Sequence, residues 1–294
     1  MGATRTYRAE RQHFVQDRRV VGAVGPQRGG DTRAVLGELW VTAAHVRALD
    51  ERVPGLVTGL FVTGSVPLGD YWPGRSDIDF VAVMERPPTE GELGRLAKAH
   101  AALEPPLPPG PDYDGIYLTR AQLAVPPAED GCAPQILGGE FQPAKPGGQF
   151  NPVTWLELAR HGLPILGERP EVALNEGVLR RWLLGNLDGY WAGFAAMAGP
   201  QFASIPPETP VPAEPVLWGV TGPGRLHYTL ATGEITTKTQ AAAYTAGLFP
   251  QWAELCDRAA RSRAGEDVPF TAADGLAATE LVAAVVTHAH THHA

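Results

Sequence analysis

Two short apolar runs, separated by a turn-rich segment, constrain the fold of this chain more than any other feature. The first run is Leu56–Thr63, which ends at Gly64-Ser65, and the second is Ile78–Met84. Runs of this length that are rich in β-branched residues and bounded by glycine, proline or serine are typical of buried strands. The segment between them, residues 67–76, is rich in turn-forming residues. The pattern therefore predicts two strands that belong to one sheet.

The remaining periodicity divides the chain into an α/β part and a helical part. Helical spacing over 31–51, which Asp31 is expected to cap, and over 89–103 flanks these strands, and 114–119 reads as a third strand. Residues 125–151 are rich in proline and glycine and are expected to form a long loop. After the apolar-periodic stretch 172–197, further helices are expected over 216–231, 237–247, 250–263 and 271–289.

These patterns predict an α/β + α fold with two domains. The N-terminal domain, residues 31–150, is expected to contain a small mixed sheet with flanking helices. The C-terminal domain, residues 151–294, is expected to be an all-helical bundle. Residues 1–30 show no clear periodicity and are interpreted as an extension.

Composition excludes several classes of function. The chain has 294 residues, with 24 basic and 32 acidic side chains and a net charge of −8. This balance argues against nonspecific binding of nucleic acid or of an anionic membrane, and no apolar stretch of about 18 residues is present to span one. Cys132 and Cys256 are far apart, so a reducing cytoplasm is expected. The histidine-rich end, residues 287–294, is expected to be a frayed polar tail.

The residues that end the first strand and begin the second form a constellation with chemical meaning. Small residues at Gly64-Ser65 let backbone N–H groups approach an anion, and the serine hydroxyl adds a donor. Asp77 and Asp79 are two residues apart, so both carboxylates lie on one strand face. Carboxylates beside a phosphate-binding turn suit Mg²⁺, which bridges the phosphates of a nucleoside triphosphate. The alternative is an ordinary turn beside two solvated aspartates.

The order of these residues resembles a known superfamily signature. The pattern Gly-Ser, then Gly, then Ser-Asp-x-Asp resembles that of the DNA polymerase β-like nucleotidyltransferases. It is matched here by Gly64, Ser65, Gly69, Ser76, Asp77 and Asp79. The resemblance implies a nucleotidyltransferase fold for the N-terminal domain.

The helical half resembles one branch of this superfamily, the aminoglycoside 3''/9-adenylyltransferases. That branch carries an Arg-x-x-Tyr-x-x-x-x-Gly-x-Ile-x-x-Lys pattern, whose arginine and lysine contact the ATP phosphates. The pattern is matched here by Arg225, Tyr228, Gly233, Ile235 and Lys238. The resemblance therefore implies that Arg225 and Lys238, together with Gly64, Ser65 and Ser76, hold the nucleotide.

The resemblance also implies a third acid and an acceptor site. An ungapped match places Asp114 as the third acid, a metal ligand or general base, with Asp112 as its competitor. Glu140-Phe141 occupies the place of a family tryptophan, and Glu214 lies beside Pro215, where the family has an aspartate. Glu208 is a further candidate. The segment 222–224, Gly-Pro-Gly, is expected to break or kink a helix that the family keeps continuous.

The resemblance implies an enzyme that transfers AMP from ATP to a hydroxyl group and releases pyrophosphate. It would use Mg²⁺, with two ions expected, held by Asp77, Asp79 and Asp114. The favoured acceptor is an aminoglycoside or aminocyclitol of the streptomycin or spectinomycin type, which implies antibiotic resistance. Two alternatives stay open: transfer to a metabolite or protein, and a non-catalytic nucleotide sensor. A cytoplasmic monomer without nucleic-acid or membrane partners is expected.

Overall fold

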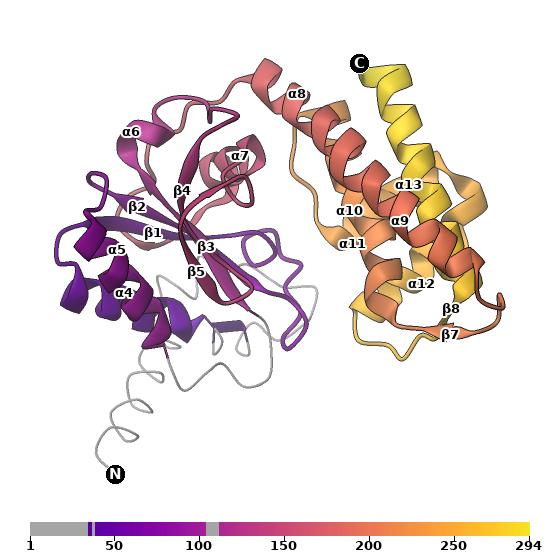
Figure 1. The fold of residues 1–294 in the computed structure, drawn as a ribbon, viewed down its shortest axis with the longest axis horizontal. Coiled ribbons are helices and arrows are strands. Elements are labelled where there is room, and N and C mark those ends of the chain that lie inside the picture. The colour runs from indigo at the N-terminus through magenta and orange to yellow at the C-terminus, as the bar shows by residue number, and fades with distance from the viewer. Residues whose placement is uncertain (1–34, 37–38, 104–111) are drawn as a thin grey trace, which may run out of the picture. The chain divides into compact units, whose positions relative to one another are not determined.

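The computed structural model describes residues 35–36, 39–103 and 112–294. The expected extension 1–30, the expected cap residue Asp31 and the proline-rich residues 104–111 lie outside the described residues. The chain forms two compact units, residues 1–175 and 176–294 (Figure 1). Each unit has its own apolar core.

The first unit is built on a six-stranded mixed sheet with the order β5-β4-β3-β2-β1-β6. β2 and β3 are parallel, whereas every other neighbouring pair is antiparallel. The sheet therefore confirms the mixed topology that the strand pattern predicts. The strands are β1 (Val57–Thr63), β2 (Ile78–Met84), β3 (Tyr113–Thr119), β4 (Cys132–Leu137), β5 (Glu140–Pro146) and β6 (Leu163–Leu166).

Both faces of the sheet are covered, which explains why the central strands are almost continuously apolar. Helices α4 (Trp40–Arg52) and α5 (Glu90–Ala101) pack side by side on one face (Figure 1). They share a core cluster with sheet residues such as Phe80. Helix α7 (Pro152–His161) covers the other face, where Trp155 joins Phe61 in a second core cluster. The short helix α6 (Arg120–Leu123) follows β3 directly.

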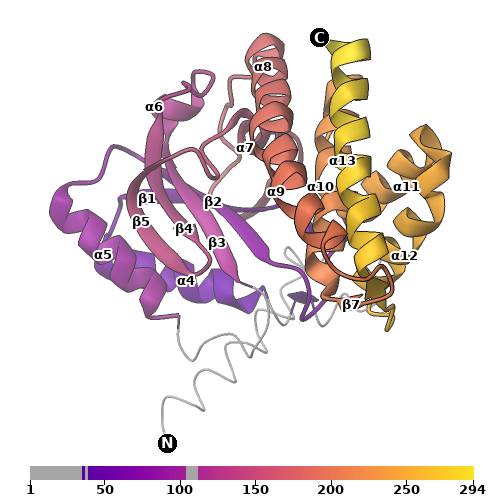
Figure 2. The same ribbon diagram turned by 45° about the vertical axis from the view of Figure 1, so that its right-hand side comes forward.

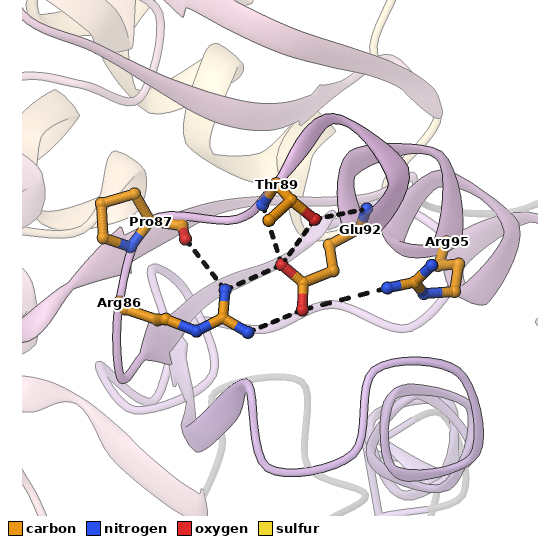
Figure 3. Close-up of polar contacts among 5 residues, drawn as sticks. All are labelled: Arg86, Pro87, Thr89, Glu92 and Arg95. Carbon is orange, nitrogen blue, oxygen red and sulfur yellow. Dashed lines mark hydrogen bonds and ion pairs between the residues drawn. The ribbon is translucent and has the colours of Figure 1, made fainter.

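A charged capping network fixes the start of α5. Thr89 accepts a hydrogen bond from the backbone N–H of Glu92, and Glu92 accepts one from the backbone N–H of Thr89 (Figure 3). Arg86 donates to both carboxylate oxygens of Glu92 at 2.8 Å, and Arg95 lies 3.9 Å from one of them. The sequence Thr-x-x-Glu is the signature of this capping box. These bonds lower the pKa of Glu92 well below its usual range.

Two expectations for the first unit are corrected by the structure. The expected loop 125–151 contains the hairpin of β4 and β5, whose strands are joined by the two-residue turn Gly138-Gly139. The expected domain boundary near residue 150 is also wrong, since the units divide after Asn175. The physical reason is that β6 pairs with β1 and α7 buries its Trp155 against the sheet.

The second unit is a helical bundle in which α13 packs against α9 and α10, and α10 also packs against α11 (Figure 2). A two-stranded sheet of β7 (Pro210–Val211) and β8 (Phe270–Thr271) is added to it, so the unit is not strictly all-helical. The helices are α8 (Glu176–Asn186), α9 (Ala192–Ala203), α10 (Ala213–Thr232), α11 (Lys238–Leu248), α12 (Ala253–Arg263) and α13 (Ala272–His293), with a π-helical turn Leu187–Trp191 and a 3₁₀ turn Pro250–Trp252.

The Gly-Pro-Gly segment does not break α10, which runs continuously from Ala213 to Thr232 with Pro223 inside it. The two glycines make room for neighbouring side chains. A Cβ atom on Gly222 would lie 1.9 Å from the Trp191 ring, and one on Gly224 would lie 2.3 Å from the Thr245 hydroxyl. The segment therefore serves close packing within the bundle.

The C-terminal histidines are part of the bundle, which corrects the expectation of a frayed tail. Helix α13 extends to His293, and His288 Nδ1 lies 2.8 Å from Nε2 of the buried His227. His290 contacts Asp188 at 2.6 Å. Among the described residues, no helix is long and apolar enough to cross a membrane.

Candidate active site

The candidate site begins with Asp79, which lies near the start of β2 in the middle of the sheet. Its register partner on β1 is Thr63, and its register partner on β3 is Asp114. Partners in adjacent strands share one face of the sheet and are about 4.8 Å apart in the hydrogen-bonding direction. The structure therefore places Asp79 and Asp114 side by side, as expected for two acids of one site.

The turn after β1 lies directly against the Asp79 carboxylate. Gly64 has φ +68°, and a Cβ atom at this position would lie 2.5 Å from Asp79 Oδ2. Both the left-handed backbone and the close approach require glycine. The first half of the Gly-Ser motif is thus in contact with the second half of the Asp-x-Asp motif.

Ser65 presents a buried hydroxyl group next to this contact. Within the part of the chain that the structure describes, its Oγ atom has no hydrogen-bond partner. The turn itself is ordered, since the backbone N–H of Asp70 donates to the Ser65 carbonyl at 3.0 Å. A buried polar group without a partner costs free energy, so such a group points to a ligand that supplies the bond. A phosphate oxygen meets this requirement.

The segment that leads into β2 is held by Ser76. The Ser76 hydroxyl is buried and accepts a hydrogen bond from the backbone N–H of Trp72 at 3.0 Å. The Trp72 indole in turn donates to Asp70 at 3.3 Å. Ser76 therefore closes the turn before Asp77, which is exposed and lies one residue before β2.

Asp114, the predicted third acid, is held by the hairpin turn between β4 and β5. The backbone N–H of Gly138 donates to Asp114 Oδ2 at 2.8 Å, and that of Gly139 donates to Oδ1 at 3.0 Å. Burial raises the pKa of Asp114, the two N–H bonds oppose this effect, and the nearby charges of Asp112 and Asp77 add to it. Asp112 is exposed and lies before β3.

The carboxylates of the candidate site supply part of what a magnesium ion needs. No group of three or more histidine, cysteine, aspartate or glutamate side chains converges as a metal site within residues 39–103 and 112–294. Mg²⁺ in nucleotide enzymes is usually held by one or two carboxylates, with phosphate oxygens and water as its other ligands. The Asp79 and Asp114 pair, with Asp77 nearby in sequence, fits that mode rather than a cage made of protein alone.

Arg225 and Lys238 lie on the helical unit, where α10 packs against α11. Both side chains are half-buried. Lys238 is the first residue of α11, after a capping box at Thr237, and the first turn contains no acidic residue. Its ammonium group lies 5.7 Å from the centroid of the Trp218 ring. A helix N-terminus with an added cation favours anions such as phosphate.

The predicted acceptor residues differ in their surroundings. Glu140 is exposed at the start of β5, and Glu214 is exposed in the first turn of α10. Phe141 is half-buried and packs against the core of the first unit, with its ring centroid 6.4 Å from that of Tyr117. The structure thus gives Phe141 a packing role. Glu208, the further candidate, is exposed and lies just before β7.

A polar network lies on the opposite face of the sheet from the two acids. His45 on α4 is fully buried, with Nδ1 at 3.1 Å from the Tyr113 hydroxyl and Nε2 at 2.8 Å from the Tyr117 hydroxyl. Burial lowers the pKa of His45 to about 3, so the imidazole is neutral at pH 7. This network belongs to the packing between α4 and β3.

Sequence reasoning missed the Gly138-Gly139 turn, which is the main structural partner of Asp114. The signal was present, because two consecutive glycines between short runs are typical of a two-residue hairpin with left-handed backbone. Their φ angles are +58° and +76°. The prolines of the two flanking strands obscured the strand pattern around them.

Comparisons with known proteins agree with this geometry. The model of the nucleotidyltransferase domain family matches residues 43–110. No curated protein sequence matches the chain. Among solved structures, that of spectinomycin adenyltransferase AAD(9) from Enterococcus faecialis with ATP and spectinomycin is similar, with a TM-score of 0.62 and 14% identity over 84% of this chain and 98% of that chain. The expected fold class is confirmed by this likeness, and the expected enzyme class by the family model.

Proposed function

We propose that this chain, an aminoglycoside adenylyltransferase-like protein, transfers AMP from ATP to a hydroxyl group of a small molecule. The proposal proceeds from the nucleotidyltransferase domain that the family model matches. The observation that carries the proposal is the contact between the Gly64 turn and the Asp79 carboxylate, with Asp114 beside Asp79 on the next strand. A phosphate-binding turn and two acids on one sheet face are the parts that this chemistry needs.

Asp77, Asp79 and Asp114 are the residues that would hold magnesium, with two ions expected. Bound there, Mg²⁺ would neutralise charge on the triphosphate and on the leaving pyrophosphate. The buried hydroxyl of Ser65 would donate to a phosphate oxygen. Ser76 would contribute by keeping the turn before Asp77 in place, since its own hydroxyl is already bonded to Trp72.

In the proposed reaction the acceptor hydroxyl oxygen attacks the α-phosphorus of ATP. A bond forms between that oxygen and the phosphorus, and the bond to the bridging oxygen of the β-phosphate breaks. Asp114 accepts the hydroxyl proton, and pyrophosphate leaves with the electron pair of the broken bond. A carboxylate whose pKa is raised by burial is a better base than an exposed one, which supports Asp114 over Asp112.

Arg225 and Lys238 would supply positive charge to the triphosphate from the helical unit. An arginine offers a planar fork of donors, and a lysine offers a compact charge. The position of Lys238 at the start of α11 supports this role, because the helix dipole adds to its charge. The assignment of both residues rests on the motif that they share with the adenylyltransferases.

We propose an aminoglycoside or aminocyclitol as the acceptor, which would make the protein an antibiotic-resistance enzyme. Glu140 pairs with Leu137, the residue opposite Asp114 in the continued β3–β4 register, so it shares a sheet face with both acids. Two strand spacings, about 10 Å, separate Glu140 from Asp114, within the span of a polycyclic aminocyclitol. Glu214 would add a second anionic contact for ammonium groups.

A different acceptor is the second candidate, and two observations favour it. The chain has Pro215 where the family has an acceptor-binding aspartate, and the half-buried Phe141 packs against the core of the first unit. A metabolite or protein hydroxyl would fit this departure. In either case we propose a monomeric cytoplasmic enzyme without nucleic-acid or membrane partners. The free cysteines Cys132 and Cys256 fit a reducing compartment.

The test is a panel of acceptors incubated with labelled ATP and Mg²⁺, with pyrophosphate release as the readout. Streptomycin, spectinomycin and other aminoglycosides form one arm, and a metabolite extract forms the other. We expect release with an aminoglycoside or aminocyclitol, and its loss in Asp79→Asn. Growth of a susceptible host that expresses the chain provides an independent check. Binding of ATP by calorimetry without turnover on any acceptor would instead identify a nucleotide sensor.

A further inference from the structure

The β4–β5 hairpin holds Asp114 through the backbone N–H groups of the turn at its tip. The turn is two residues long, because Leu137 pairs with Glu140. Both turn residues are glycines with positive φ, and their N–H groups donate to the two different oxygens of one carboxylate. A carboxylate bonded at both oxygens has a fixed plane, in contrast to one that rotates about its Cβ–Cγ bond.

The two hydrogen bonds from Gly138 and Gly139 to Asp114, here called the clamp, leave part of the carboxylate free to accept further bonds. An ionised carboxylate offers about four lone-pair sites, and two of them are taken by Gly138 and Gly139. One site on each oxygen therefore remains for a hydroxyl proton or for an ion. Asp79, in register on the neighbouring strand, lies on the side away from the hairpin, since β3 separates β2 from β4.

We infer that the Gly138-Gly139 turn is a positioning element for the transfer reaction. It fixes the Asp114 carboxylate next to Asp79, and Asp112 has no comparable support from the turn. This inference rests on the proposed function and deepens it, because it selects one acid and identifies the segment that orients it. Glu140 follows the turn directly, so the same hairpin connects the base to the residue proposed to bind the acceptor.

The turn can be perturbed without steric contact, which gives a clean test. A side chain at Gly138 or Gly139 would meet no atom within 4 Å, so the effect of a substitution is confined to the backbone. Gly139→Val places a β-branched residue at φ +76° and should distort the turn. Gly138→Asn should preserve it, because Asn-Gly is the preferred sequence of such turns.

Gly55 provides a matched control. It has φ +70°, lies in the turn before β1, and a side chain there would likewise meet no atom within 4 Å. Gly55→Val therefore imposes similar backbone strain away from Asp114. Thermal melting of all three variants separates loss of folding from loss of positioning.

The experiment measures kcat and KM for ATP and for the accepted antibiotic in the full chain. We expect Gly139→Val to lower kcat roughly 100-fold, as is typical of a displacement of about 1 Å in a reacting group. KM for ATP should change by less than about threefold. Gly138→Asn and Gly55→Val should keep kcat within about threefold of the wild type. A Gly139→Val enzyme with wild-type kcat would overturn the inference, whereas an inactive wild type would refute the proposed function itself.

Amide hydrogen exchange gives a readout that needs no turnover. In the wild type the N–H groups of Gly138 and Gly139 should be protected. Asp114→Asn should reduce this protection at least tenfold, and Asp112→Asn should leave it unchanged. Equal exchange in the wild type and in Asp114→Asn would show that the clamp does not form, and would reject the inference irrespective of the acceptor.

Discussion

At the scale of single residues, the contact between Gly64 and Asp79 is the most restrictive feature of the proposed site. Gly64→Ala would force a Cβ atom to within 2.5 Å of Asp79 Oδ2 at φ +68°. The backbone cost of roughly 1–2 kcal/mol is shared by Gly55→Ala, which has no such clash. We expect both variants to melt at a slightly lower temperature, and only Gly64→Ala to lose pyrophosphate release about 100-fold. Equal activities would show that the contact is unimportant.

Two serines of the same motif should respond differently to alanine, because one hydroxyl is bonded and the other is not. Ser65 has a buried, unbonded Oγ atom among the described residues, whereas the Ser76 hydroxyl is bonded to the Trp72 N–H. Ser65→Ala should therefore leave the free energy of unfolding unchanged and raise KM for ATP about tenfold, the value of one hydrogen bond to a charged group. Ser76→Ala should lower stability by about 1 kcal/mol. Urea unfolding and steady-state kinetics distinguish the two.

At the scale of elements, the capping network of α5 predicts an acid-dependent contribution to stability. The folded-state pKa of Glu92 lies below its unfolded value, so its contribution is present above about pH 4.5 and is lost as the pH falls through the folded pKa. Glu92→Gln should be less stable than the wild type at pH 7, and the difference should shrink at pH 3. Glu90→Gln, an exposed residue in the same helical turn, is the control. A difference between Glu92→Gln and the wild type that is independent of pH would contradict this account.

Elements were predictable where one physical signal dominated. β1 and β2 followed from apolar runs, and α5 and α11 from helical spacing, because these signals are local. The β4–β5 hairpin was missed because Pro134 and Pro143 weaken the strand pattern, although proline is tolerated toward the edge of a sheet. The Gly-Pro-Gly segment of α10 was misread for a related reason: the need for glycine arises from Trp191, a residue 31 positions from Gly222 in the sequence. Sequence spacing does not reveal such tertiary packing.

At the scale of the whole molecule, the Gly-Ser and Asp-x-Asp motifs were predictable from the sequence, but the position at which the chain divides into two units was not. Asp77, Asp79 and the Gly64-Ser65 turn lie within about 20 residues of each other, close enough for spacing to carry meaning. The boundary between the units depends on β6, a four-residue strand that pairs with β1 at the edge of the sheet. Such a short strand has no periodicity of its own, so only the folded sheet shows that residues up to Asn175 belong to the first unit.

Each unit contains a buried histidine whose side chain is neutral in the folded protein. We therefore expect both units to lose stability in mild acid. Burial lowers the pKa of His45 to about 3 and that of His227 to about 4, where neighbouring His288, His292 and His293 add to the effect. Because both folded values lie below the unfolded value of about 6.5, the stabilisation is complete above pH 6.5 and falls as the pH drops from there toward 4.

This loss can be assigned to one unit at a time. Urea unfolding between pH 7.5 and 5 should show falling stability in the wild type, and His227→Gln should weaken this pH dependence in the helical unit. Tyr244, which bonds to His227 Nδ1 at 2.8 Å, keeps its charge state over this range, so it does not contribute to the trend. His45→Gln should likewise weaken the pH dependence of the sheet unit. The neighbouring Tyr113 and Tyr117 stay uncharged over this pH range, so they do not contribute to the trend. If neither substitution altered the slope of stability against pH, the buried histidines would not be its source.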